Sequence, residues 1–165
     1  MIPAAAATDY FNWTGFYVGV NATSGQFTDG GLEADTTSYG LQAGYLYDIG
    51  RLVIGGELSH AKGEYSGAFA TSDFDATRFK LIGGYDAGRL LPYAFVGASN
   101  YTVNNTFSSD LSDTVTIYGI GARVALGSTG RHVLGLEYMV EDKDSFDNNF
   151  NLESSEVALR YDFRF

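Results

Sequence analysis

Two histidines occur in the 165 residues, and one of them, His60, lies beside a serine and close to an acid. Ser59, His60 and Glu64 are the residue types of a Ser-His-acid hydrolase, in which histidine takes the proton of the serine hydroxyl. Ser59 and His60 are neighbours in an alternating segment, however, so their side chains point to opposite faces of a strand. The serine also lacks the G-x-S-x-G turn of many hydrolases. We therefore expect no enzyme.

Other cofactor and ligand chemistries also find weak support. A single histidine without a supporting pocket is a poor haem ligand, and His132 falls in a turn, where we expect it to be solvated. The acidic segment 141–147 does not have EF-hand spacing, and the absence of cysteine excludes thiolate metal sites. Acids outnumber bases 20 to 10, which argues against nucleic-acid binding. We expect no metal and no cofactor.

The remaining chemistry is charge placed at alternate positions of strand-like segments. In the last nine residues an apolar face alternates with Ala158, Arg160, Asp162 and Arg164. Side chains alternate between the two faces of a strand, so such a segment has one apolar and one charged face. The same alternation predicts a network of five acids and five bases on a common face: Glu57, Arg78, Lys80, Arg123, Glu137, Glu141, Glu156, Arg160, Asp162 and Arg164.

Short turns divide the chain into the strands that must position these charges. The sequence Tyr47-Asp-Ile-Gly-Arg-Leu52 recurs as Tyr85-Asp-Ala-Gly-Arg-Leu90, and a third glycine-rich turn covers 127–131. Aspartate and glycine favour tight turns, since Asp bonds its own backbone and Gly supplies a positive φ. Three such turns imply four hairpins. We predict eight strands, at about 15–27, 37–47, 52–62, 76–85, 91–103, 114–126, 132–141 and 152–165.

The connections between these strands alternate in length. Longer, acidic connections are expected at 28–36, 63–75, 104–113 and 142–151, so they all fall on one rim and the short turns on the other. Short periplasmic turns and long outer loops are typical of a bacterial outer-membrane barrel. No apolar run approaches the roughly 20 residues of a membrane helix, but transmembrane strands do not need one. We predict an all-β, eight-stranded antiparallel up-and-down transmembrane barrel.

Aromatic residues are expected to form a girdle at each membrane interface, around a belt of Val, Leu, Ile and Ala. In strand five we place the odd-numbered residues on the lipid face, with Phe95 and Tyr93 among them. The girdle predicted at the short-turn rim consists of Trp13, Tyr45, Tyr47, Tyr85, Tyr93, Tyr161, Phe163 and Phe165.

The charged face is then predicted to look inward. Side chains just fill an eight-stranded barrel, so the ten charges should pair and plug the lumen. Outside, each Arg or Lys near the membrane midplane would cost about 2–4 kcal/mol. A soluble barrel with its apolar face inward would have to enclose more than twenty large apolar groups, which exceeds the available room.

The opening Trp13-Thr-Gly-Phe-Tyr-Val-Gly-Val-Asn21 resembles that of small alphaproteobacterial outer-membrane barrels, the Omp25/Omp31-like proteins within the OmpA/OmpX-like eight-stranded class. Leu91-Pro-Tyr93 with Gly97, Gly135-Leu-Glu-Tyr138 and the terminal Tyr161-Asp-Phe-Arg-Phe165 resemble their fifth, seventh and last strands. The resemblance implies an outer-membrane location. It also implies that Phe165 belongs to a terminal signal for the barrel-assembly machinery, and it says little about activity.

We therefore predict a non-enzymatic outer-membrane protein that contributes to membrane integrity and surface interaction. Its expected surroundings are outer-membrane lipid and lipopolysaccharide, with a possible surface partner at the acidic loops. Two alternatives stay open: a narrow channel for small solutes, and a haemin- or ligand-binding surface receptor. Residues 1–12 lack both a basic segment and a long apolar one, and are predicted to be an extension of the mature chain before a barrel domain at 13–165.

Overall fold

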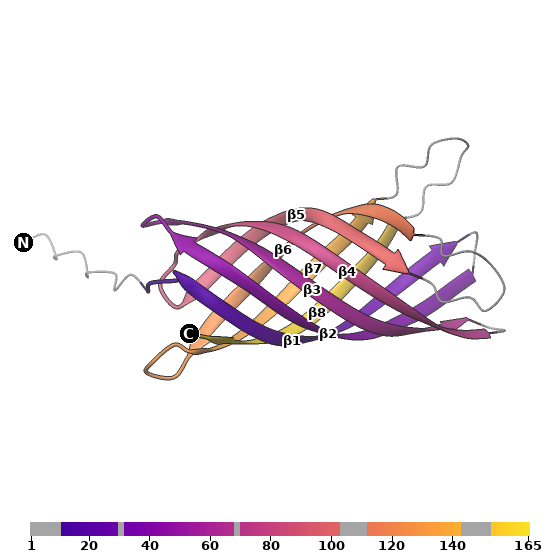
Figure 1. Ribbon diagram of the computed structural model, residues 1–165, viewed down its shortest axis with the longest axis horizontal. Coiled ribbons are helices and arrows are strands. Elements are labelled where there is room, and N and C mark those ends of the chain that lie inside the picture. The colour runs from indigo at the N-terminus through magenta and orange to yellow at the C-terminus, as the bar shows by residue number, and fades with distance from the viewer. Residues whose placement is uncertain (1–10, 30–31, 68–69, 103–111, 143–152) are drawn as a thin grey trace, which may run out of the picture.

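Eight antiparallel strands form one closed barrel in the computed structural model, as Figure 1 shows. The structure describes residues 11–29, 32–67, 70–102, 112–142 and 153–165. No helix in these ranges is long and apolar enough to cross a membrane, a finding that does not bear on strands. The strands are β1 (Gly15–Asp29), β2 (Leu32–Asp48), β3 (Leu52–Gly67), β4 (Ala70–Tyr85), β5 (Leu90–Thr102), β6 (Ser112–Leu126), β7 (His132–Asp142) and β8 (Glu153–Arg164). The predicted fold class is confirmed.

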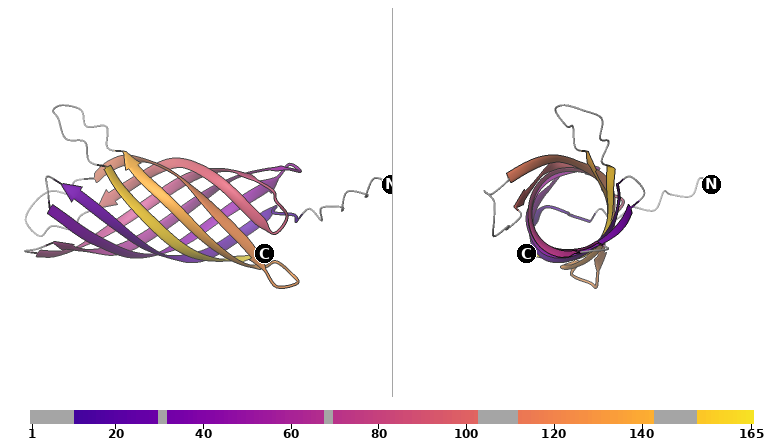
Figure 2. Two further views of the ribbon diagram at one scale, coloured as in Figure 1. Left: turned by 180° about the vertical axis from the view of Figure 1, so that it is seen from behind. Right: turned by 90° about the vertical axis from the view of Figure 1, so that its right-hand side faces the viewer.

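The barrel closes where the last strand meets the first. Strand β8 pairs with β1 from Tyr17↔Arg164 to Phe27↔Ser154, and the Phe165 N–H donates to the Phe16 carbonyl at 3.0 Å. The end-on view in Figure 2 shows the resulting ring. Closure pairs both edges of the sheet, as a strand structure in hydrocarbon requires.

Two of the short turns share a sequence but use their aspartates differently. Gly50 and Gly88 have φ values of 85° and 76°, the left-handed conformation expected of glycine in a tight turn. The Asp86 carboxylate accepts the Gly88 N–H at 2.7 Å, which is the predicted local contact. Asp48 instead accepts the backbone N–H of Trp13 at 3.1 Å. The first turn therefore anchors the segment that enters β1.

Two of the long connections were predicted too long. The sequence places connections at 28–36 and 63–75, whereas β1 and β2 pair as far as Asp29↔Leu32, and β3 and β4 as far as Gly67↔Ala70. Threonine, serine and tyrosine in these segments favour extended backbone, and the ladder continues through them. Most of the other two predicted connections, 104–113 and 142–151, lies outside the described residues.

The outer wall is mostly apolar, and the interior holds charged side chains beside an apolar cluster around Trp13. Leucine, isoleucine, valine and aromatic side chains are exposed along every strand, as in Phe16, Leu41, Leu58 and Ile120. Charged side chains at alternate positions are buried inside. An interior that is charged and an exterior that is apolar reverse the order of a soluble protein, as membrane insertion requires.

The predicted orientation of strand β5 is wrong. Leu91, Tyr93 and Phe95 are at most 5% exposed and point inward, whereas Leu90 and Val96 face outward. Both faces of this strand are apolar, so alternation alone did not choose between them. The interior offers what the aromatic rings need: a carboxylate for the Tyr93 hydroxyl, and the Lys80 ammonium 4.6 Å from the centre of the Phe95 ring.

Candidate functional site

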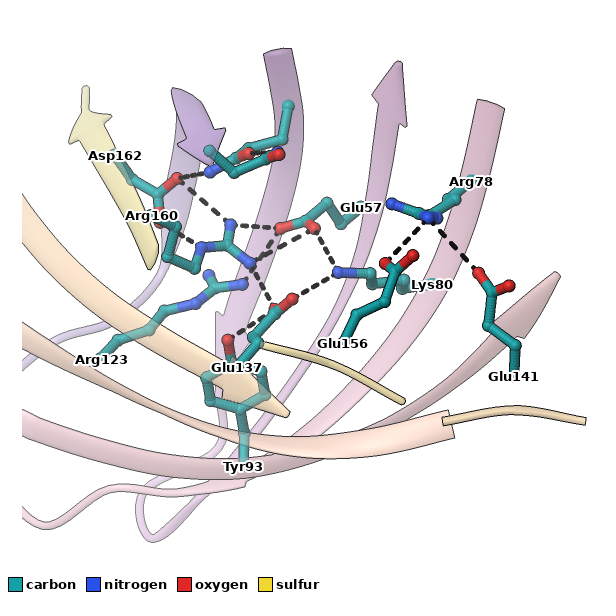
Figure 3. A network of polar contacts seen from close by, with 12 residues as sticks. Glu57, Arg78, Lys80, Tyr93, Arg123, Glu137, Glu141, Glu156, Arg160 and Asp162 are labelled. Carbon is teal, nitrogen blue, oxygen red and sulfur yellow. Dashed lines mark hydrogen bonds and ion pairs between the residues drawn. The ribbon is translucent and has the colours of Figure 1, made fainter. Parts of the chain in front are cut away.

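The middle of the barrel is filled by a cluster of buried charges, drawn in Figure 3. We call Glu57, Lys80, Arg123, Glu137, Arg160 and Asp162 the central cluster. Each of its six side chains is at most 6% exposed, and they come from β3, β4, β6, β7 and β8. Three carboxylates face three cations, so the cluster is balanced in charge. Buried charges are tolerated when they are paired and hydrogen-bonded in this way.

Glu57 contacts more members of the central cluster than a simple ion pair would. Its carboxylate pairs with Arg123 at 3.1 Å, with Lys80 at 3.4 Å, and with Arg160 through a short contact. The Tyr17 hydroxyl donates to the same carboxylate at 2.7 Å. Four strands thus send a donor to one side chain, which fixes their mutual positions across the lumen.

Glu137 is the second hub. Lys80 donates to its carboxylate at 2.6 Å and Tyr93 at 2.6 Å, and Arg160 forms a short ion pair with it. Arg160 reaches Asp162 as well, with Nε and Oδ2 separated by 3.1 Å. Lys80 bridges two carboxylates and Arg160 bridges three, so the cluster is one connected network rather than separate pairs.

Two tyrosines hold the most deeply buried cation. The guanidinium of Arg123 lies 4.7 Å from the centre of the Tyr17 ring and 4.8 Å from that of Tyr93. Arg123 is 1% exposed. A cation between two aromatic faces is stabilised by the electrons of both rings, and more strongly where water is excluded. The tyrosines therefore serve the network both through their hydroxyls and through their rings.

A second group of predicted charges lies farther from the short turns. Arg78 pairs with Glu156 at 3.1 Å and with Glu141 at 3.3 Å, and we call these three residues the rim cluster. Between the two clusters the structure leaves a polar space of only about 10 Å³, lined by residues of both, among them Glu57, Arg78 and Glu156. A space of this size holds about one water molecule.

Glycine at position 135 makes room for Arg160. A Cβ added there would lie 2.6 Å from Cγ and 2.9 Å from Cδ of the arginine. We expect Gly135→Ala to push the guanidinium off its partners and to lower the free energy of unfolding by about 1–3 kcal/mol. Urea unfolding in detergent, followed by fluorescence of the single tryptophan, measures the change. At Gly83 an added Cβ meets nothing within 4 Å, so Gly83→Ala is the matched control. An equal loss in both variants would contradict the packing role of Gly135.

Arg164, predicted to join the charge network, lies apart from both clusters at the short-turn mouth. Its guanidinium sits 5.2 Å from the Trp13 ring and 4.9 Å from the Phe11 ring, and it donates to the Asn12 carbonyl at 2.8 Å. Two residues of the predicted extension, Phe11 and Asn12, thus contact the barrel wall.

Trp13 is not a girdle residue, contrary to the prediction. It is 0% exposed, and its indole Nε1–H donates to the Gly88 carbonyl at 3.0 Å. The Gly88 carbonyl and the Asp48 carboxylate accept its two N–H groups inside the mouth. Nearby, burial raises the pKa of the Asp86 carboxyl, and the Asp48 charge adds to this shift while the Gly88 N–H opposes it.

The other predicted girdle residues point outward. Tyr45, Tyr47, Tyr85, Tyr161 and Phe165 are 38–73% exposed, and Phe163 is half-buried on the same face. His132, expected to be solvated, is exposed; its ring contacts those of Tyr161 and Phe163, and its Nδ1 lies 2.6 Å from the Tyr161 hydroxyl. Tyr93 lies inside instead, hydrogen-bonded to Glu137.

The hydrolase candidates are separated by the barrel wall. Ser59 is buried inside at 6% exposure, whereas His60 is exposed outside and contacts Thr77. The side chain of Glu64 is outside the described part, as are those of segment 143–147. In the portion of the chain that the structure describes, no three His, Cys, Asp or Glu residues come together as a metal site.

Tyr17 and Gln42 lie at inward-facing positions of β1 and β2, and the sequence prediction of the network did not include them. Gln42 donates to Asp162 at 2.7 Å, and Tyr17 donates to Glu57 at 2.7 Å. A polar residue within an inward-facing series was the available signal for both. Tyr93 carried no such signal, because its strand is apolar on both faces.

Comparison with known proteins finds a matching family and several similar barrels. The family model described as "Outer membrane protein beta-barrel domain" matches residues 1–165. Neisserial surface protein A is 21% identical with a TM-score of 0.63, covering 92% of this chain and 98% of its own. Ail, the attachment invasion locus protein of Yersinia pestis, is 14% identical with a TM-score of 0.64, covering 92% and 99%. No curated protein matches. At these identities the structures show likeness of fold.

Proposed function

Since this chain belongs to the outer membrane protein β-barrel domain family and is a protein of the bacterial outer membrane, we propose that it is a non-enzymatic barrel with a plugged lumen. In this role it contributes to membrane integrity and to interactions at the cell surface. The observation that carries the proposal is the central cluster. Six paired charges and two tyrosines occupy the cross-section where a channel would need water.

A plugged lumen predicts a protein that does not conduct. We expect purified protein, folded into planar lipid bilayers, to give no stable openings above the background of the bilayer. The conductance of the neutralised variants Arg123→Gln and Glu137→Gln is compared with that of the wild type. Water and ions cross only where a continuous polar path exists, and the gap between the clusters holds about one water molecule.

A narrow channel is the main alternative, because the lumen is polar and its charges could rearrange. Stable openings in the wild-type protein that vanish when Arg123 or Glu137 is neutralised would favour the channel and overturn the plugged lumen. A haemin receptor has less support. His60 lies on the outer wall with Thr77 and Asp75 around its ring, where no second histidine accompanies it among the described residues.

The proposed surface role rests on the acidic connections that the sequence predicts. The acidic connections predicted at 104–113 and 142–151 are the proposed contact region for a surface partner. The name of the similar barrel Ail refers to attachment, which agrees with such a role without assigning it.

Three finer assignments belong to the same proposal. The opening Trp13–Asn21 supports the alphaproteobacterial Omp25/Omp31-like branch. The exposed aromatic end at Phe165, beside the closing β1–β8 ladder, supports a signal for the barrel-assembly machinery. The division into an extension at 1–12 and a barrel domain at 13–165 is kept, with the contacts of Phe11 and Asn12 at the mouth added to it.

A further inference from the structure

The outer wall carries a group of charged and polar side chains on strands β3 and β4. His60 and Lys62 of β3 and Asp75 and Thr77 of β4 lie on the two neighbouring strands, and all four point outward or to the wall surface. The His60 Nδ1 lies 3.0 Å from the Thr77 hydroxyl. Asp75 pairs with His60 at 3.6 Å and with Lys62 at 3.7 Å. We call these four residues the wall cluster.

The position of the wall cluster fits the outer membrane interface. Strand β3 begins at Leu52 beside the short turns. At a rise of about 3.3 Å per residue and a tilt of about 40°, His60 stands about 20 Å and Lys62 about 25 Å above that end. The apolar band of such barrels is about 25 Å tall. The cluster therefore lies where the headgroups of the outer leaflet begin.

Two open apolar depressions lead to the cluster. They have volumes of about 570 and 590 Å³ and share Val20, Leu41, His60 and Tyr161, so they run on either side of one row of residues. This row crosses from β8 through β1 and β2 to β3, with Tyr161↔Val20, Val20↔Leu41 and Leu41↔His60 as partners. The small side chains of Ala22 and Ala43 line one depression each. Apolar grooves that end at a polar group suit a molecule with acyl chains and a polar head.

The charges and exposure of the wall cluster indicate which chemical groups the polar head of such a molecule carries. Lys62 is 78% exposed and Asp75 30%, so the ammonium group rather than the carboxylate is presented to the membrane. The Asp75 Oδ1 atom is shielded and has no hydrogen-bond partner among the described residues, since its two ion-pair contacts exceed hydrogen-bond length. A ligand that places a phosphate on Lys62 and an O–H or N–H donor on Asp75 would satisfy both groups.

We propose that the wall cluster and its two depressions bind a phosphorylated glycolipid of the outer leaflet. The sugar phosphate contacts Lys62 and His60, a sugar hydroxyl or amide donates to Asp75, and acyl chains lie along Ala22 and Ala43. This proposal goes beyond the plugged lumen and is independent of it, because it concerns the outer wall and would stand even if the barrel conducts.

The test is lipid binding by the intact chain in detergent micelles, measured by native mass spectrometry. The probes are bisphosphorylated lipid A, the same lipid without phosphates, and phosphatidylethanolamine. We expect wild-type protein to prefer bisphosphorylated over dephosphorylated lipid A by up to about fivefold, the upper end for one exposed ion pair. Lys62→Ala should abolish this preference. Arg131→Ala, which removes an exposed cation at the opposite rim, should retain it.

The depressions are tested separately from the charge. Ala22→Leu and Ala43→Leu fill the grooves with lipid-compatible side chains and should weaken binding of both forms of lipid A. Three results would overturn the proposal. The first is equal binding of phosphorylated and dephosphorylated lipid A by the wild type, and the second is an equal loss of the preference for phosphorylated lipid A in Lys62→Ala and Arg131→Ala. The third is binding of phosphatidylethanolamine as tight as that of lipid A. The shift in gel mobility on boiling verifies that every variant is folded.

Discussion

Replacing Glu57 by alanine should lower the free energy of unfolding by about 3–5 kcal/mol, the range for removing one partner of a buried ion pair. Glu57 pairs with Arg123, Lys80 and Arg160 and accepts the Tyr17 hydroxyl. Without it, three buried cations face the two carboxylates of Glu137 and Asp162. Urea unfolding in detergent, followed by the fluorescence of Trp13, measures the loss.

Tyr17→Phe is the matched control for this prediction. It removes the hydrogen bond to the same carboxylate and the one that Arg123 donates to the hydroxyl at 3.3 Å, but it keeps the ring beside Arg123 and leaves the charge balance intact. We expect a loss of about 0.5–1.5 kcal/mol. A double variant, Glu57→Ala with Arg160→Met, should recover part of the stability because it removes a cation as well. If Glu57→Ala costs no more than Tyr17→Phe, the central cluster does not bind the strands together.

Much of the barrel was predictable because lipid imposes a strong pattern. A transmembrane strand must alternate apolar and polar side chains, and short glycine turns must separate the strands at one rim. Both signals were clear in the chain, and the eight strands and their closure follow from them. Strand ends were less predictable. The ladder between β1 and β2 continues to Asp29↔Leu32, and the Asp-Gly-Gly sequence at this end is a turn signal that the strand prediction did not use.

The charged interior was predictable in its members but less so in its contacts. Alternation assigns Glu57, Glu137 and Arg160 to the inner face, but their pairing depends on the tilt and stagger of the strands, which join residues far apart in the chain. Alternation does not predict which face of strand β5 points inward, since both of its faces are apolar. Its orientation depends on whether the interior supplies a partner for Tyr93, and that partner, Glu137, lies on another strand.

Replacing Trp13 by alanine should lower the free energy of unfolding by about 3–5 kcal/mol, as for other buried tryptophans. The indole is fully buried, donates to the Gly88 carbonyl at 3.0 Å, and stacks with Arg164. Its backbone N–H is held by Asp48. The segment before β1 is thus fastened to the turns after β2 and β4 and to the end of β8, so the loss should loosen the mouth where the barrel closes. The loss of folded, fast-migrating protein with rising urea on gels measures the effect without the missing fluorophore.

Leu52→Ala is a suitable comparison, because this side chain is exposed at the same rim and faces the membrane. Its truncation removes contact with lipid but leaves no internal cavity, so we expect a markedly smaller loss than for Trp13→Ala. Trp13→Phe should fall between the two, since it keeps an aromatic ring for Arg164 but cannot donate to Gly88. If Trp13→Ala unfolds at the same urea concentration as Leu52→Ala, the mouth is held by the β1–β8 ladder alone, and the segment before β1 is not part of the closure.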